Sequence, residues 1–247
     1  MTAQAFKAAD AFARQFEGTA MRPHEAFRAA IEVLCCVTLA TVPQYQMEEL
    51  AKEFDEAIRS FERCGVSREK ALTLAKDFME ALAADGGDRL GDMAARLGTL
   101  YAGMGQFFTP SCVASLLANF VLPDEATIRR HVANGGYMTA EDPAAGSGGL
   151  LIALAQRVRE AGFDPRFNLF VQATEKDVQA WRMCYVQLSA YDIPARVVLG
   201  DSLTLDRWRV AYTPAYWRFY KPRRDLDALL TLATQPAPET QPLMAAE

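Results

Sequence analysis

Apolar residues return at three- and four-residue steps through the first hundred positions, which is the spacing of one face of an α-helix. The clearest stripe consists of Met47, Leu50, Phe54, Ile58 and Phe61. Two further stripes follow at residues 71–82 and 90–100, after breaks at residues 64–67 and 85–88. The pattern predicts an N-terminal helical domain at residues 1–104, with these stripes as its core.

The pattern changes after Gly105, where short β-type runs alternate with helical segments. Strands are expected at residues 137–141, 169–174 and 195–199, with helices at residues 149–161 and 177–191 between them. This order, with right-handed crossovers, indicates an α/β fold with a parallel sheet covered by helices. A preceding helix is expected to start at Thr109 and Pro110, capped by the threonine, with four residues facing inward: Val113, Leu116, Leu117 and Phe120.

Composition adds bounds to this picture. A hydrophobic content of 51% over 247 residues is enough for a sizeable core. Residues 225–247 are expected to be a C-terminal tail, disordered from residue 236 onward because they have almost nothing to bury. The start of the chain lacks a basic region followed by an apolar run, and no stretch of about eighteen apolar residues occurs. We expect a cytoplasmic protein with no membrane segment.

Charge, cysteine and histidine usage exclude several classes of site. The formal net charge of −5 gives no global electrostatic reason to expect nucleic-acid binding, although a local basic patch could act. Five cysteines occur without Cys-x-x-Cys spacing and are expected to be reduced core residues. The two histidines, His24 and His131, are far apart, so we expect no histidine-built metal site and no bound metal.

Suitable binding groups follow all three expected strands, where ligands of open α/β sheets lie. After the first strand, Gly146, Gly148 and Gly149 allow close backbone approach, and the next helix offers free amides to a ligand carboxylate. After the second, Glu175 could accept hydrogen bonds from two ribose hydroxyls. After the third, Asp201 could accept one from an adenine amine. Together these groups describe S-adenosylmethionine, although each alone is also typical of an ordinary turn or strand end.

These motifs resemble those of the N6-adenine DNA methylases found as modification subunits of type I restriction-modification systems. Residues 142–148 are similar to the family's Asp-Pro-Ala-Cys-Gly-Ser-Gly loop, with Ala145 in place of the cysteine. Residues 105–110 resemble the segment that precedes the family's core, residues 173–175 its ribose-binding acidic position, and residues 200–203 its Gly-Asp-Ser/Thr-Leu motif. The resemblance covers about residues 20 to 205.

The resemblance implies a Rossmann-like S-adenosyl-L-methionine methyltransferase core at residues 105–224, with a truncated parallel sheet. It implies a cofactor site made of Gln106, Phe107, Thr109, Asp142, Ala144, Gly146, Gly148, Glu175, Asp201 and Ser202. It also implies DNA methylation within restriction-modification, with DNA as the substrate.

The family's catalytic motif, Asn/Asp-Pro-Pro-Tyr/Phe, is not present, because the sequence contains no Pro-Pro pair. Its nearest counterpart is residues 213–216, in which Thr213 would orient the target amine and Tyr216 would stack on a flipped base. The expected strand before it, at residues 208–212, is short and carries an arginine. Catalytic competence is therefore an open question at this stage.

Only 44 residues follow Leu203, which leaves no room for the four further strands of the family's sheet. In that fold the fourth strand pairs with the first, so we expect the first strand to need another cover. The candidates are the segment at residues 207–224, the N-terminal helices, a second copy of the chain or a separate subunit.

Residues 207–224 contain six cations, six aromatic residues and no acidic residue. One hypothesis is a nucleic-acid contact through Arg209, Arg218, Lys221, Arg223 and Arg224, with bases stacked on the rings. The simpler hypothesis is that the rings pack over the sheet while the cations point to water.

Two classes of function remain from the sequence. The first is an S-adenosylmethionine-binding DNA adenine-N6 methyltransferase homologue. The second is a non-catalytic methylase-like accessory protein that serves as a restriction-modification or anti-restriction partner. Methyl transfer to RNA, protein or a small molecule is a third alternative.

Overall fold

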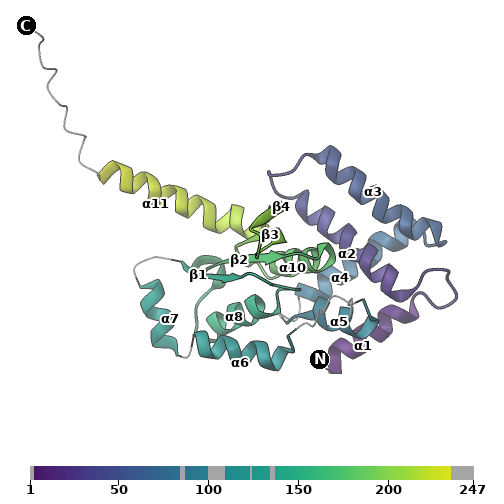
Figure 1. The fold of residues 1–247 in the computed structure, drawn as a ribbon, viewed down its shortest axis with the longest axis horizontal. Coiled ribbons are helices and arrows are strands. Elements are labelled where there is room, and N and C mark those ends of the chain that lie inside the picture. The colour runs from purple at the N-terminus through teal and green to yellow at the C-terminus, as the bar shows by residue number, and fades with distance from the viewer. Residues whose placement is uncertain (1–2, 84–86, 100–108, 123, 134–136, 235–247) are drawn as a thin grey trace, which may run out of the picture.

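The computed structural model describes residues 3–83, 87–99, 109–122, 124–133 and 137–234. Of the tail predicted at residues 225–247, residues 225–234 are helical, because they continue the helix α11 (Lys221–Thr234), and residues 235–247 lie outside the described residues. The N-terminal helices gather at one end of the molecule (Figure 1). They are α1 (Ala3–Arg14), α2 (Pro23–Leu39), α3 (Met47–Arg63), α4 (Arg68–Ala83) and α5 (Arg89–Leu97).

The helical stripes are largely confirmed. Leu50, Ile58 and Phe61 of α3 are buried, and every apolar member of the α4 stripe is buried too. Phe54 of α3 and Leu97 of α5 are half-buried, and Leu100 lies outside the described residues. Met47 is 62% exposed, because it is the first residue of α3 and lies beyond the packed turns. Buried residues of these helices and of the sheet form one continuous hydrophobic core. The domain boundaries at residues 104 and 224 therefore stay a prediction.

The sheet has the order β1-β2-β3-β4, and its first three strands are parallel. They are β1 (Met138–Asp142), β2 (Leu169–Glu175) and β3 (Ala195–Asp201), joined through α8 (Gly149–Glu160), α9 (Pro165–Asn168) and α10 (Val178–Ala190). The predicted α/β class, strands and connecting helices are confirmed. Parallel strands end at the same edge of a sheet, so this topology brings Asp142, Glu175 and Asp201 to one edge.

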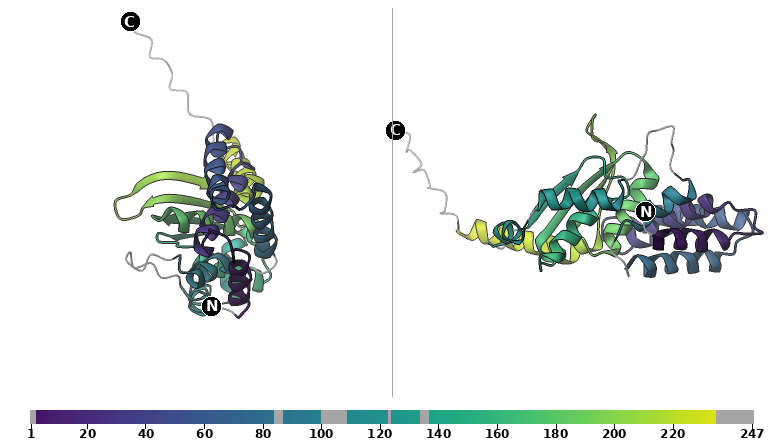
Figure 2. Two further views of the ribbon diagram at one scale, coloured as in Figure 1. Left: turned by 90° about the vertical axis from the view of Figure 1, so that its right-hand side faces the viewer. Right: turned by 90° about the horizontal axis from the view of Figure 1, so that it is seen from below.

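The strand expected at residues 208–212 forms as β4 (Asp206–Tyr212), but it pairs antiparallel with β3 and not with β1. A short connection explains this placement. Only residues 202–205 separate β3 from β4, and Leu205 turns the chain with a φ of 63°. A link this short makes a hairpin, because a parallel neighbour needs a crossover of about a dozen residues. The hairpin extends from the body of the molecule (Figure 2) and leaves β1 at the end of the sheet.

The aromatic rings after β4 pack over the sheet, as the simpler of the two hypotheses for residues 207–224 proposed. They lie in η2 (Tyr216–Tyr220), a π-helical turn that leads into α11 (Lys221–Thr234). Tyr220 stacks on Phe170 of β2 with ring centroids 4.3 Å apart, and its edge meets Tyr137 at 4.7 Å. In Figures 1 and 2, α11 points away from the body at the end opposite α1–α4.

The inward-facing stripe predicted after Thr109 is wrong. A helix does form there, α6 (Ser111–Val121), and α7 (Glu125–Val132) follows it. The buried residues of α6 are the small Ala114 and Ala118. They pack with Ala153 and Leu150 of α8, where small side chains let the two helices approach closely. Five larger residues are exposed instead: Val113, Leu116, Leu117, Phe120 and Val121. Thr109 does not cap this helix, because Pro110 occupies the cap position and no side-chain cap bond forms.

The cysteine prediction holds for part of the set. Cys35, Cys36 and Cys184 are buried, whereas Cys64 is half-buried and Cys112 is exposed at the start of α6. Within the described residues, no helix has the length and apolar content to cross a membrane. The same residues contain no group of three or more histidine, cysteine or acidic side chains placed to share a metal ion.

One ion pair ties β4 to the N-terminal helices. Arg209 donates two hydrogen bonds to Glu53 of α3, at 2.9 and 3.0 Å, and its guanidinium lies over the rings of Tyr45 and Trp181. Both charged side chains are largely covered, so either one would lack compensation without the other.

Replacing Glu53 with Gln should therefore lower the free energy of unfolding by about 1–3 kcal/mol, between the values for exposed and fully buried pairs. Urea titration followed by circular dichroism would measure the loss. Glu49→Gln, at an exposed position of the same helix, is the control and should change stability little. Equal effects of the two variants would show that the pair does not anchor β4.

Candidate functional site

The glycine loop that follows β1 requires two positive-φ glycines. Gly146 has a φ of 56° and Gly148 a φ of 92°, a backbone region that side chains disfavour. A Cβ at Gly148 would also lie 3.1 Å from Cys184 Sγ. The loop is held against β2, since Ala145 N donates to Thr174 O at 3.0 Å, and α8 begins directly after it at Gly149. The N-terminal amides of a twelve-residue helix thus open beside the loop.

Glu175, the last residue of β2, binds the loop directly. Its Oε2 accepts from Gly146 N at 2.8 Å, while Oε1 accepts from Lys176 N and Asp177 N, each at 2.8 Å. An ionised carboxylate offers about four acceptor positions, so little of this capacity remains. Glu175 therefore fixes the shape of the loop, and a ligand hydroxyl would have to share it.

Asp201 ends β3 beside Glu175. Its Oδ1 accepts from Leu203 N at 2.9 Å, and its Oδ2 accepts from Lys176 Nζ at 2.6 Å. The bond from Lys176 lowers the pKa of Asp201. Glycine is required at the neighbouring position 200, because a Cβ there would lie 2.1 Å from the Asp206 carbonyl oxygen across the hairpin.

Asp142, where β1 ends and the loop begins, has a carboxylate oxygen without a hydrogen-bond partner among the described residues. Its Oδ1 accepts from Ala144 N at 3.1 Å, whereas its buried Oδ2 has no hydrogen-bond partner among the described residues. Burial raises the pKa of this carboxyl. An unpartnered buried oxygen is costly, so the position favours a donor group from a ligand.

A hydrogen-bond network that the sequence did not predict lies behind the loop. Ser147 Oγ donates to Asp88 Oδ2 at 2.6 Å, and Gln187 Nε2 donates to both Asp88 Oδ1 and the Ser147 carbonyl. Asp88 also caps α5 by accepting from Gly91 N at 2.9 Å, and burial raises its pKa. Residues 85–88 were assigned only as a break, although an aspartate before a new helix is itself a capping signal.

The remaining predicted cofactor residues lie in different settings. Gln106 and Phe107 fall outside the described residues. Thr109 and Ser202 are half-buried, and Ala144 is exposed in the loop. The structure thus brings together the loop, Glu175 and Asp201, the three groups that the strand ends predicted.

The two predicted catalytic residues are not brought to this site. Thr213 is fully buried, donates to Ile193 O at 2.8 Å and accepts from Ala195 N at 3.0 Å. Ala195 is the first residue of β3, whereas Asp201 is the last, so Thr213 lies at the opposite end of the sheet. Tyr216 is buried in the aromatic cluster, 4.3 Å from the ring of Tyr212. The antiparallel return of β4 causes this displacement from the expected position beside the cofactor.

The cations proposed for nucleic acid each have a partner inside the protein. Arg209 pairs with Glu53, Lys221 and Arg224 pair with Asp225, and Arg218 lies over Phe219. Arg223 lies over Tyr137 and donates to Phe167 O. These contacts favour a structural role for the set.

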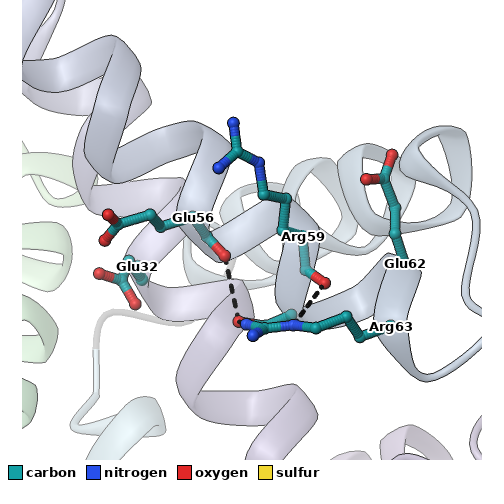
Figure 3. A pocket seen from close by; sticks show the side chains of 6 residues that line it. Glu32, Glu56, Arg59, Glu62 and Arg63 are labelled. Carbon is teal, nitrogen blue, oxygen red and sulfur yellow. Dashed lines mark hydrogen bonds between the residues drawn. The ribbon is translucent and has the colours of Figure 1, made fainter.

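A second concave surface lies between α2 and α3, far along the chain from the loop (Figure 3). It encloses about 500 Å³ and is lined by Glu32, Glu56, Arg59, Ser60, Glu62 and Arg63. Arg63 Nε donates to Arg59 O and Ser60 Oγ to Glu56 O, so two of these side chains bond to their own helix.

Comparison with known proteins places the loop in a family. The sequence model described as N-6 DNA Methylase matches residues 90–220, which is more than half of the chain. A putative class I S-adenosylmethionine-dependent methyltransferase from Listeria monocytogenes is 16% identical, with a TM-score of 0.37 over 72% of this chain and 54% of that one. A type I restriction-modification system methyltransferase subunit from Streptococcus thermophilus is 18% identical, with a TM-score of 0.36 over 81% and 44%.

This chain therefore spans about half the length of each of these two solved structures. No curated protein matches it.

Asp88→Ala should lower the free energy of unfolding by about 2–4 kcal/mol, because it removes a helix cap and leaves the buried donors Ser147 and Gln187 without this acceptor. Asp124→Ala is the matched control, since Asp124 caps α7 by accepting from Thr127 N at an exposed site. It should cost only about 1 kcal/mol. Chemical denaturation of both variants would measure the difference. Equal losses of stability would show that the network around Asp88 adds nothing beyond the helix cap.

Thr213→Val should cost about 1–3 kcal/mol, because it leaves the buried Ala195 amide without an acceptor. Thr213→Ser keeps the hydroxyl and should remain close to the parent protein. Thermal unfolding of the three proteins would test this. A destabilised Ser variant together with a stable Val variant would contradict the assigned hydrogen bonds.

Proposed function

This chain belongs to the N-6 DNA methylase family, and on that premise we propose that the glycine loop and the adjoining strand ends bind S-adenosylmethionine. The observation that supports this most directly is the convergence of the loop, Glu175 and Asp201 at one edge of the sheet. The unpartnered Asp142 Oδ2 adds a buried acceptor for a charged or polar donor.

The residues present suit the parts of this cofactor. The α8 N-terminus offers amides to a carboxylate, and Asp142 offers an acceptor to an ammonium group. Glu175 and Asp201 supply acceptors for ribose hydroxyls and an adenine amine. Gly146 and Gly148 keep side chains out of the loop.

When bound, this cofactor supplies an electrophilic methyl group. The chain's own contribution is to hold the cofactor, since Glu175 and the Asp88 network fix the loop before the ligand arrives. Orienting a target amine is a separate task. Thr213 and Tyr216 are committed to packing at the other end of the sheet, so neither serves as a receiver of the target base in this arrangement.

Titration calorimetry with S-adenosylmethionine tests the binding site. The parent protein should bind, and Gly148→Ala should weaken binding by roughly tenfold or more, because the residue has a positive φ and a Cβ would contact Cys184. Gly162→Ala is a matched control, since Gly162 also has a positive φ, 81°, but has open space around it. No binding by the parent protein, or equal weakening by both variants, would refute the site.

The second candidate is a non-catalytic, methylase-like accessory protein, and the burial of Thr213 favours it. Tritium transfer from labelled S-adenosylmethionine to adenine-containing DNA discriminates the two. A protein that binds the cofactor but transfers no label supports the accessory role. Label transfer that survives Thr213→Val and Tyr216→Ala would show an active enzyme whose acceptor groups lie elsewhere.

A further inference from the structure

Within the part of the chain that the structure describes, no strand pairs with the outer edge of β1. Among the described residues, β2 is its one neighbouring strand. Thr139 and Glu141 are exposed, although β1 carries the start of the glycine loop. Soluble proteins normally cover or interrupt such an edge, because its free amides and carbonyls pair readily with another strand.

The backbone groups at this edge can be assigned from the ladder. Val171 N donates to Pro194 O, so alternate residues of β2 starting at Val171 face β3. Thr174 O accepts from Ala145 N, so the intervening residues face β1. Thr139 and Glu141 are the register partners of the intervening Phe170 and Gln172. In a parallel pair such partners point their own N–H and C=O groups away, so those of Thr139 and Glu141 face outward.

An apolar surface flanks this edge. The exposed residues of α6, at positions 113, 116, 117, 120 and 121, have the spacing of an amphipathic stripe, and Phe120 is 71% exposed. A groove of about 480 Å³ runs from this stripe to the strand, lined by Leu117, Val121, Ala140 and Leu154 among others. The stripe and the strand edge thus form one continuous surface.

We infer that a second copy of this chain covers this surface, with β1 pairing antiparallel to β1 of its partner around a two-fold axis at Ala140. In this register Thr139 lies opposite Glu141 of the other copy, so outward-facing groups meet and four backbone hydrogen bonds form. A register centred on Glu141 would place like charges opposite each other, which is unfavourable.

Charge supports a copy of the same chain as the occupant. Residues 110–122 contain no charged residue, so two such helices can meet without repulsion. A two-fold axis perpendicular to the sheet keeps α6 of both copies on the same face, and an isologous contact then buries stripe against stripe. On the other face, α11 leads away from the body with Leu226 and Leu229 exposed (Figure 1).

Sedimentation equilibrium of the full chain is the first test, and it does not depend on cofactor binding. We expect twice the 27.3 kDa mass of one chain. Thr139→Pro removes an outward amide without touching the β2 ladder and should weaken the dimer roughly tenfold or more, whereas Thr139→Ala keeps that amide and should not. Phe120→Glu should also dissociate it, and Met47→Glu, a control on α3 that is 62% exposed, should not.

A cross-link gives a positive test of the register in a Cys112→Ser background. Ala140→Cys should form a disulfide between copies on mild oxidation, because facing residues at such a two-fold lie within disulfide range. Thr139→Cys should not form one, since residue 139 of the other copy lies diagonally across the pair of strands and not directly opposite. A monomeric parent protein overturns the proposal. This holds even if its β1 amides are protected from hydrogen exchange, because another part of the chain would then cover the edge. A dimer that is insensitive to Thr139→Pro and Phe120→Glu overturns it as well.

Discussion

The half-buried carboxylate of Asp88 is the group on which the glycine loop depends. It caps α5 through Gly91 N, receives Ser147 Oγ from the loop and receives Gln187 Nε2 from α10. Two glycines in different elements accommodate it, because a Cβ at Gly91 would lie 2.4 Å from Asp88 Oδ2 and one at Gly149 only 2.8 Å from it. A partly desolvated carboxylate is stabilised when its acceptor positions are filled. The N-terminal helices therefore help to shape the loop, and a core cut at residue 104 would still need α5.

The second constraint is the length of the link between β3 and β4. Four residues cannot return the chain to the far side of β1, so β4 folds back on β3 and covers that edge. This one choice moves Thr213 to the wrong end of the sheet for a group that must meet the cofactor. It also gives the rings of η2 a sheet face to cover, which accounts for the aromatic content of residues 207–224.

The parts of the structure that follow local rules could be predicted from the sequence. The strand ends at Asp142, Glu175 and Asp201 were located because β-type runs and helical spacing are local signals. The antiparallel pairing of β4 differs from the parallel sheet that the resemblance implies, because the short link to β3 decides the pairing. The orientation of α6 was missed for another reason. Its apolar stripe is the usual signal for a buried face. In the structure, however, Ala114 and Ala118 face α8, because close packing of two helices requires small residues. The partners of Asp88 come from three distant segments, which no local pattern reveals.

The open edge and the glycine loop belong to the same strand. β1 ends at Asp142, and the loop begins there, so any contact that fixes β1 also fixes the first residues of the loop. If pairing of two copies orders this strand, the cofactor binds a loop whose ordering has already been achieved. Linkage then requires the reverse as well: a cofactor that stabilises the loop must strengthen the pairing by the same factor. The proposed pairing surface and the proposed cofactor site would then be coupled through the five residues of β1.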